Sequence, residues 1–238
     1  MAIERVKTGV EGLDDILGGG FPKKRSIIVA GGPGTGKTLF CMQFLYAGAK
    51  AGEVGIFIST EEERDRIIEN VMAAFPEWAD FEKLVEEDRV VITKVEPFPK
   101  IATERKWFEN LQELIEAFVS QYKASRVAID SATIIKAGFS SDFDFRKSMV
   151  FLLEYVAKLD ATVLLTVEMP TAERDGFAFD VEEFLADGVI ILYNFPREES
   201  RIRALEVLKM RGARHVGKLV PLKFTNSGLR VFPGEKVY

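Results

Sequence analysis

The sequence predicts an α/β fold with a mostly parallel sheet flanked by helices. Three observations lead to this prediction. Short runs rich in β-branched residues indicate buried strands, and they alternate with longer segments whose apolar residues recur at helical spacing. Strands that are apolar throughout and alternate with amphipathic helices are typical of a parallel sheet covered on both faces. The last apolar runs have no helices between them, which predicts an antiparallel C-terminal edge.

The expected elements can be placed in chain order. Strands are expected at residues 26–30, 54–59, 90–95, 126–130, 162–167 and 189–193. One helix should run from about Lys37 to Ala49. Two more are marked by the apolar series Trp107, Leu111, Leu114, Ile115, Phe118 and the series Phe145, Met149, Leu152, Leu153, Val156. The antiparallel edge is expected from segments 201–210, 219–225 and 229–232.

The composition excludes several classes of function. The chain has 238 residues, of which 47% are hydrophobic and 29% charged, and we expect a single domain over residues 1–238. One cysteine and one histidine exclude a disulfide framework and a multi-thiolate or His-rich metal site. The net charge of −5 argues against a surface dominated by nucleic-acid phosphates. No apolar run approaches the ~20 residues of a membrane helix, and no secretory signal is visible, so we expect a cytoplasmic protein without a membrane partner.

A phosphate-binding loop lies between the first expected strand and the helix that follows it. Residues 31–38 read GGPGTGKT and match the pattern G-x-x-x-x-G-K-[ST] in full. Glycines let the backbone turn its N–H groups toward phosphates, and the helix N-terminus adds its dipole. Lys37 can reach the β- and γ-phosphates and so assist catalysis, while the Thr38 hydroxyl can bind Mg²⁺. The expected nucleotide-binding residues are Gly32, Pro33, Gly34, Thr35, Gly36, Lys37, Thr38 and Leu39.

Three carboxylates follow expected strands, where ligands collect in open α/β sheets. Asp130 closes the apolar strand 126–130 and is expected to help hold Mg²⁺ from outside the ion's direct ligands, behind Thr38. Glu61 and Glu62 follow the strand at 54–59, and we expect them to orient or activate the water that attacks the terminal phosphate. The next residue, Glu63, is interpreted as an acidic residue that favours the first turn of a helix.

These motifs resemble those of the RecA superfamily of P-loop ATPases, and within it the KaiC-like group. The resemblance also covers residues 8–22 before the core, 186–190 late in the core, and the C-terminal segments 207–212 and 224–228. One departure is Lys23-Lys24, where the family often has a glycine turn. The resemblance implies a RecA-like core in which the Asp130 strand lies beside the strand carrying Glu61 and Glu62. It also implies that the nucleotide is ATP.

The same resemblance implies a homo-oligomer, most simply a hexameric ring, with ATP bound between neighbouring subunits. In the KaiC-like group a Lys-x-Arg in a C-terminal strand reaches the neighbour's nucleotide, and here those residues are Lys209 and Arg211. A cation supplied in trans would stabilise negative charge in the transition state of phosphoryl transfer.

The function expected is that of a KaiC-like Mg-ATP-binding protein, a slow ATPase whose nucleotide state controls its oligomer or an unknown partner protein. Two alternatives stay open. One is a scaffold that binds ATP without hydrolysing it. The other is a RecA/RadA-like recombination or repair ATPase that holds single-stranded DNA with loops near residues 133–147 and 169–180. DNA binding is not favoured, because Phe145 belongs to a helical apolar pattern and acidic residues offset the cations of both loops.

Overall fold

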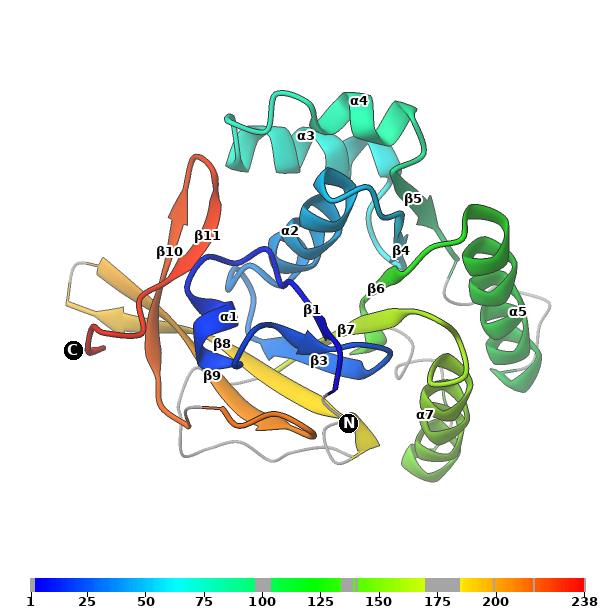
Figure 1. The fold of residues 1–238 in the computed structure, drawn as a ribbon. Coiled ribbons are helices and arrows are strands. Elements are labelled where there is room, and N and C mark those ends of the chain that lie inside the picture. Colours follow the sequence, from blue (N-terminus) through cyan, green and yellow to red (C-terminus); the bar gives the residue numbers. More distant parts are fainter. Residues whose placement is uncertain are drawn as a thin grey trace.

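A computed structural model describes residues 3–96, 104–133, 139, 141–169, 185–198, 200–215 and 217–237. Within these ranges, nine strands form one sheet in the order β11-β10-β9-β8-β3-β7-β6-β4-β5 (Figure 1). The strands are β3 (Ser26–Gly31), β4 (Gly55–Ser59), β5 (Val90–Lys94), β6 (Arg126–Asp130), β7 (Thr162–Glu168), β8 (Gly188–Arg197), β9 (Ser200–Met210), β10 (Val220–Thr225) and β11 (Gly228–Val231). A short antiparallel pair is formed by β1 (Arg5–Val6) and β2 (Phe21–Pro22).

Strand direction divides the sheet into two parts. From β8 through β3, β7, β6 and β4 to β5, each described pair is parallel. The pairs β8–β9, β9–β10 and β10–β11 are antiparallel. The predicted α/β class with an antiparallel C-terminal edge is therefore confirmed. The implied neighbour relation is present too, since Ser59 at the end of β4 pairs with Asp130 at the end of β6.

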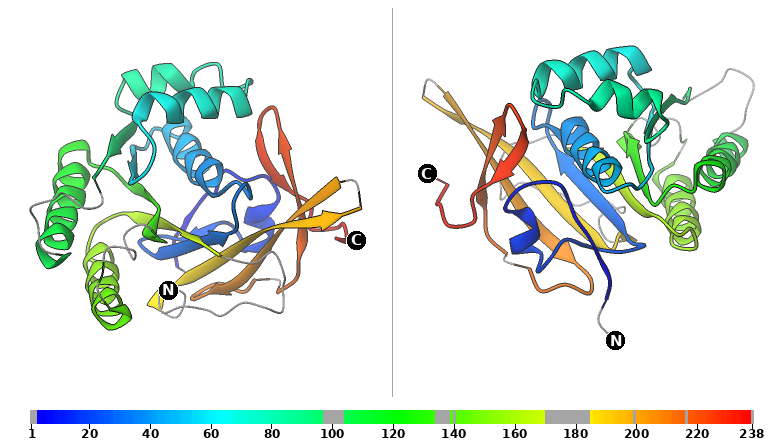
Figure 2. Two further views of the ribbon diagram at one scale, coloured as in Figure 1. Left: turned by 180° about the vertical axis from the view of Figure 1, so that it is seen from behind. Right: turned by 45° about the horizontal axis from the view of Figure 1, so that its top comes forward.

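Helices cover both faces of the sheet (Figures 1 and 2). On one face lie α1 (Leu13–Ile16), α2 (Lys37–Lys50), α3 (Arg64–Ala74) and α4 (Phe81–Glu86), and on the other α5 (Glu104–Tyr122) and α7 (Asp142–Val156). Alternate side chains of each strand enter different cores, as in β3, where Ile27 and Val29 face α2 while Ile28 and Ala30 face the opposite core. Burial on both faces explains the continuous apolar runs of the sequence.

Strand β8 is longer than the run at residues 189–193 from which it was predicted. Its pairing with β3 ends at Leu192, and from Tyr193 to Arg197 its described partner is β9 alone. Residues 194–197 are half-buried or exposed, so they form no continuous apolar run. A two-stranded ribbon of this kind lacks the pattern of a strand buried on both faces, which is why the sequence did not reveal its full length.

The prediction of one domain over residues 1–238 stays a prediction, because parts of that range lie outside the described residues. None of the helices in the described ranges combines the length and apolarity that a membrane span requires.

Candidate functional site

A cavity of about 430 Å³ lies at the carboxyl ends of the central strands. Parallel strands end at the same edge of a sheet, so loops from β3, β4, β6 and β7 meet here. Residues expected from the sequence line this cavity together with others that were not expected: Pro33, Gly34, Gly36, Lys37, Thr38, Leu39, Ser59, Glu61, Glu62, Ile67, Asn70, Asp130, Ser131, Glu168, Arg203 and Phe224. A second cavity, of about 650 Å³, lies between α5 and α7 and contains none of the predicted site residues.

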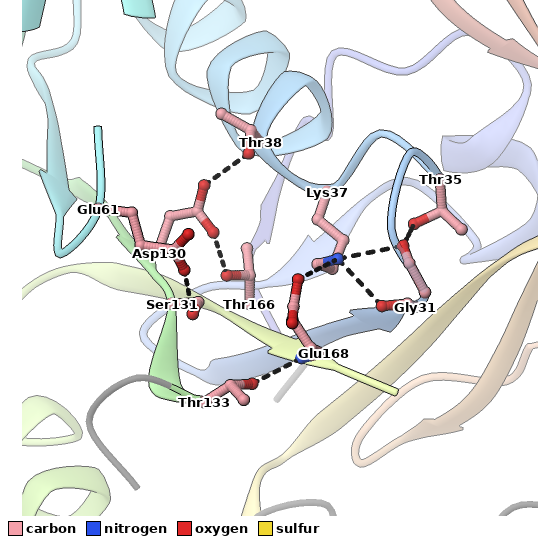
Figure 3. A network of polar contacts seen from close by, with 11 residues as sticks. Gly31, Thr35, Lys37, Thr38, Glu61, Asp130, Ser131, Thr133, Thr166 and Glu168 are labelled. Atoms are coloured by element: carbon pink, nitrogen blue, oxygen red, sulfur yellow. Dashed lines mark hydrogen bonds and ion pairs between the residues drawn. The ribbon is translucent and has the colours of Figure 1, made fainter. Parts of the chain in front are cut away.

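The phosphate-binding loop is shaped by glycines and by short internal bonds. Gly36 has a φ of 100° and precedes α2, and a Cβ there would lie 2.5 Å from the ring of Phe224. Only glycine therefore suits this position, both for its backbone angle and for its contact. The Thr35 hydroxyl donates to the Gly32 carbonyl at 2.8 Å, which closes the loop on itself (Figure 3).

Lys37, the first residue of α2, carries a buried ammonium at the cavity wall. Its Nζ donates to the carbonyls of Gly31 and Gly32 at 3.0 and 3.2 Å, and lies 3.9 Å from Oε1 of Glu168 (Figure 3). The Glu168 side chain is 49% exposed, so solvent weakens this ion pair. The positive charge of Lys37 is thus held mainly by neutral carbonyls. A polyphosphate would be a stronger partner than either carbonyl.

Asp130 presents a carboxylate that hydroxyl groups hold in place. Its Oδ2 accepts a hydrogen bond from the Thr38 hydroxyl at 2.6 Å, and its Oδ1 accepts one from the Thr166 hydroxyl (Figure 3). Among the described side chains, no Lys, Arg or His forms an ion pair with Asp130. No described cation therefore competes with a metal ion for this carboxylate, which lies next to the Thr38 hydroxyl, an arrangement that suits Mg²⁺.

In the turn after β4, the side chains of Glu61 and Glu62 form hydrogen bonds to different elements. The Ser59 hydroxyl accepts from both of their amides, at 3.2 and 2.9 Å, and so fixes the turn. Oε1 of Glu61 accepts from the Ser131 hydroxyl at 3.1 Å, beside Asp130. Oε2 of Glu62 accepts from the Asn70 amide on α3 at 2.9 Å. Of the two carboxylates, Glu61 is the one that is hydrogen-bonded to Ser131, the residue directly after Asp130.

Glu63 lies outside this arrangement. It is the residue before α3, as its helix-start interpretation expects, and its carboxylate pairs with Lys94. It is not among the residues that line the cavity.

Eight residues at or near the cavity were not predicted as site residues: Ser59, Ile67, Asn70, Ser131, Thr166, Glu168, Arg203 and Phe224. The Arg203 guanidinium lies 4.6 Å from the centre of the Phe224 ring, and its Nε is buried without a hydrogen-bond partner among the described residues. Thr166 had one signal, since a polar residue interrupts the apolar strand TVLLTVE. Glu168 had the same signal as Asp130, because it closes an apolar strand, and Ser59 and Ser131 lie within two residues of predicted site residues. The remaining residues lie on distant strands and helices, and nothing local marks them.

Lys209 and Arg211 lie beside the amino ends of the parallel strands, far from the phosphate loop at the carboxyl ends. Met210 pairs with Gly188, which pairs with Ile27 near the start of β3, whereas the phosphate loop follows Gly31 at the end of that strand. Lys209 donates to the Ala186 carbonyl at 2.6 Å; burial and then the charge of Arg211 lower its pKa. Arg211 is exposed. The structure does not bring these two cations into the cavity of their own chain.

The donor set fits magnesium bound through phosphates better than a metal held by protein alone. No group of three or more His, Cys, Asp or Glu side chains within the described ranges could hold a metal ion. Mg²⁺ usually takes one or two protein groups and completes its shell with water and phosphate oxygens. Thr38 and the hydrogen-bonded Asp130 supply such a pair. The fold and this site together define a RecA-like P-loop ATPase.

Comparison with known proteins identifies the family. A family model described as "ATPase: KaiC" matches residues 6–236. The circadian clock oscillator protein KaiC of Synechococcus elongatus is 37% identical over 235 residues, which cover 98% of this chain and 45% of that protein. The protein of the same name from Parathermosynechococcus lividus is 37% identical over 234 residues, 97% of this chain and 43% of the relative. The chain belongs to the KaiC family of ATPases and spans less than half the length of these relatives.

Proposed function

We propose that this chain binds Mg-ATP and hydrolyses it slowly, and that its nucleotide state controls its own assembly or a partner protein. One observation carries the proposal. The cavity unites the Lys37 ammonium, the Asp130–Thr38 pair and the Glu61 carboxylate, three groups that come from different elements of the fold. These are the parts that phosphoryl transfer from a nucleoside triphosphate requires. Adenine as the base is carried over from the family alone.

The residues would act as follows. Lys37 would exchange its carbonyl partners for phosphate oxygens, and the N–H groups of the loop from Gly34 to Leu39 would hold the phosphates, with Gly32 and Pro33 shaping the loop. Thr38 and Asp130 would hold Mg²⁺, which when bound neutralises charge on the phosphate oxygens. Glu61 would accept a hydrogen bond from the attacking water and take up its proton, and Glu62 would support it.

Substitution of the glutamates tests hydrolysis. Glu61→Gln should retain ATP binding and lower single-turnover hydrolysis about a hundredfold, because the amide is a poor base. Glu62→Gln tests the second carboxylate in the same way. Glu63→Gln is the matched control, since it makes the same change one residue further on, outside the cavity lining. Equal and negligible turnover in the parent and all three variants would favour the non-hydrolysing scaffold.

The proposed assembly is a homo-oligomer, most simply a hexamer, in which Lys209 and Arg211 complete the neighbour's site. Its support is their position at the sheet edge opposite the phosphate loop, together with the exposure of Arg211. Arg211→Ala should leave nucleotide binding partly intact and lower turnover. Mixing Arg211→Ala subunits with Lys37→Ala subunits should restore activity, since some sites then combine an intact loop with an intact arginine. Subunit exchange without recovery would contradict action in trans.

The remaining expectations are also part of the proposal. A pull-down in ATP and in ADP should identify the partner protein as one retained in only one of the two states. Single-stranded DNA binding stays the alternative that is not favoured. Phe145 is buried in the core and cannot stack on bases, whereas Phe143, in the same suggested loop, is 73% exposed. Of the second suggested loop, residues 170–180 lie outside the described residues. A cytoplasmic location likewise rests on the sequence.

A further inference from the structure

Strand β7 buries two threonines on the face that packs against α2, Thr162 at its amino end and Thr166 near its carboxyl end. Both residues are 0% exposed. A buried hydroxyl costs free energy unless it forms a hydrogen bond, and valine would fill the same volume in a strand without that cost. Each hydroxyl is satisfied here, but by different partners. Thr162 accepts from the Lys24 amide at 3.0 Å, whereas Thr166 donates to the Asp130 carboxylate.

The position of Thr166 in the sheet explains its contact. Strand β7 lies between β3, which leads into the phosphate loop, and β6, which ends in Asp130. Thr166 is paired with Val29 of β3, and its neighbour Leu165 is paired with Ile129 of β6. Its hydroxyl is therefore held by a central strand and reaches Asp130 from the side of the phosphate loop (Figure 3).

The two oxygens of Asp130 have one hydroxyl donor each. Thr38 binds Oδ2 and Thr166 binds Oδ1, so rotation of the carboxylate would break both bonds. With Thr38 alone, the second oxygen would be free to turn. Thr38 is also the residue whose hydroxyl oxygen would bind Mg²⁺, which leaves Thr166 as the anchor that takes no part in the metal shell. A neutral donor fixes the carboxylate and leaves its negative charge in place.

We propose that Thr166 is a positioning residue that holds the Asp130 carboxylate in the orientation needed for Mg²⁺, an inference that rests on the proposed function. Residues that orient the groups around a metal change metal affinity by about 10- to 100-fold when they are replaced. Thr166 should therefore affect the magnesium dependence of nucleotide binding and leave metal-free nucleotide binding unchanged.

Calorimetric titration with the non-hydrolysable analogue adenylyl-imidodiphosphate, with Mg²⁺ and with EDTA, tests this. Thr166→Val should raise the Mg²⁺ concentration needed for half-maximal enhancement of binding about tenfold or more, with unchanged affinity in EDTA. Thr166→Ser keeps the donor and should restore the parent value. Thr162→Val is the matched control on the same strand and face, and its magnesium dependence should equal that of the parent. If Thr166→Val does not fold, Thr166→Ala replaces it.

Two results would overturn the inference alone: a parent-like magnesium dependence in a folded Thr166→Val or Thr166→Ala protein, or an equal loss of affinity with and without metal. A parent protein that binds no Mg-nucleotide would instead overturn the proposed function, and this inference with it. The two failures are therefore distinguishable.

Discussion

The amino and carboxyl ends of the parallel strands hold their charged side chains in different ways. Strand β6 begins with Arg126 and ends with Asp130, two charged residues on the same face. Arg126 is 2% exposed and has three partners: it donates to the carbonyls of Lys7 and Phe44 at 2.9 and 2.7 Å and pairs with Glu53. Burial lowers the pKa of Arg126, and Glu53 opposes that shift.

At the carboxyl end the described charges lack counter-ions of this quality, since the pair of Lys37 with Glu168 is 3.9 Å long and half-exposed. Lys37 is bound mainly to carbonyls, Asp130 to hydroxyls and Glu61 to the Ser131 hydroxyl, and all three line the cavity. Neutral partners orient a charge but leave its field unbalanced, so that a ligand of opposite charge gains by entering. Arg126, paired with Glu53, stabilises the fold, whereas the charges held by neutral groups at the carboxyl end are available to a ligand.

The largest expected effect is a loss of ATP affinity when a charge at the carboxyl ends of the parallel strands is removed. Lys37→Ala should lower ATP affinity about a hundredfold or more, because charge-assisted bonds to phosphate are lost, and should change the free energy of unfolding by no more than about 1 kcal/mol. Titration calorimetry and chemical denaturation measure the two quantities. Lys50→Ala, at the other end of α2, is the matched control and should bind ATP as the parent does. Parent-like affinity in Lys37→Ala would show that the site is wrongly assigned.

The second largest expected effect is a loss of stability when the charge at the amino end of β6 is removed. Arg126→Met should lower the free energy of unfolding by about 3 kcal/mol, because two buried carbonyls and Glu53 lose their partner. Below its unfolding temperature the variant should bind ATP normally. Denaturant titration checks the first expectation.

Arg64→Met is the control for this second variant. It removes an exposed pair with Asp65 and should change stability by less than about 0.5 kcal/mol. If Arg64→Met and Arg126→Met lowered the free energy of unfolding equally, the structural role of Arg126 would be contradicted.

The smallest expected effect concerns the pH dependence of stability, which an exposed ion pair near the end of α2 should influence. Lys50 and then Tyr46 hold the pKa of Asp80 below its ordinary value. The stabilisation is therefore present above the unfolded-state pKa, about 3.9, and is lost as the pH falls through the lower folded-state value. In Asp80→Asn, the free energy of unfolding should depend less on pH in that acid range. At neutral pH the effect should be below about 1 kcal/mol, because the side chains of Lys50 and Asp80 are both over one-third exposed. An unchanged acid profile would contradict this account.

Much of the fold was accessible to sequence reasoning because its signals are local. Each central strand is apolar on both faces, so its run of residues is visible without its neighbours. The phosphate loop is a continuous strand–loop–helix segment, and its glycines and Lys37 appear in the order in which the fold uses them. The cavity position of Asp130 and Glu61 was predictable because Asp130 closes such a strand, Glu61 follows one two residues later, and parallel strands end at one edge.

Other features of the site depend on the order and direction of the strands in the sheet. Thr166 reaches Asp130 because β7 lies between β3 and β6, an order that no local pattern of the sequence encodes. Strand β9 runs antiparallel to β8, which places Arg203 at the cavity and Lys209 with Arg211 at the opposite edge. The sequence determined which residues carry charge and which segments form strands. The packing of distant strands decided which charges meet a counter-ion and which face a cavity, because that depends on contacts between residues far apart in the chain.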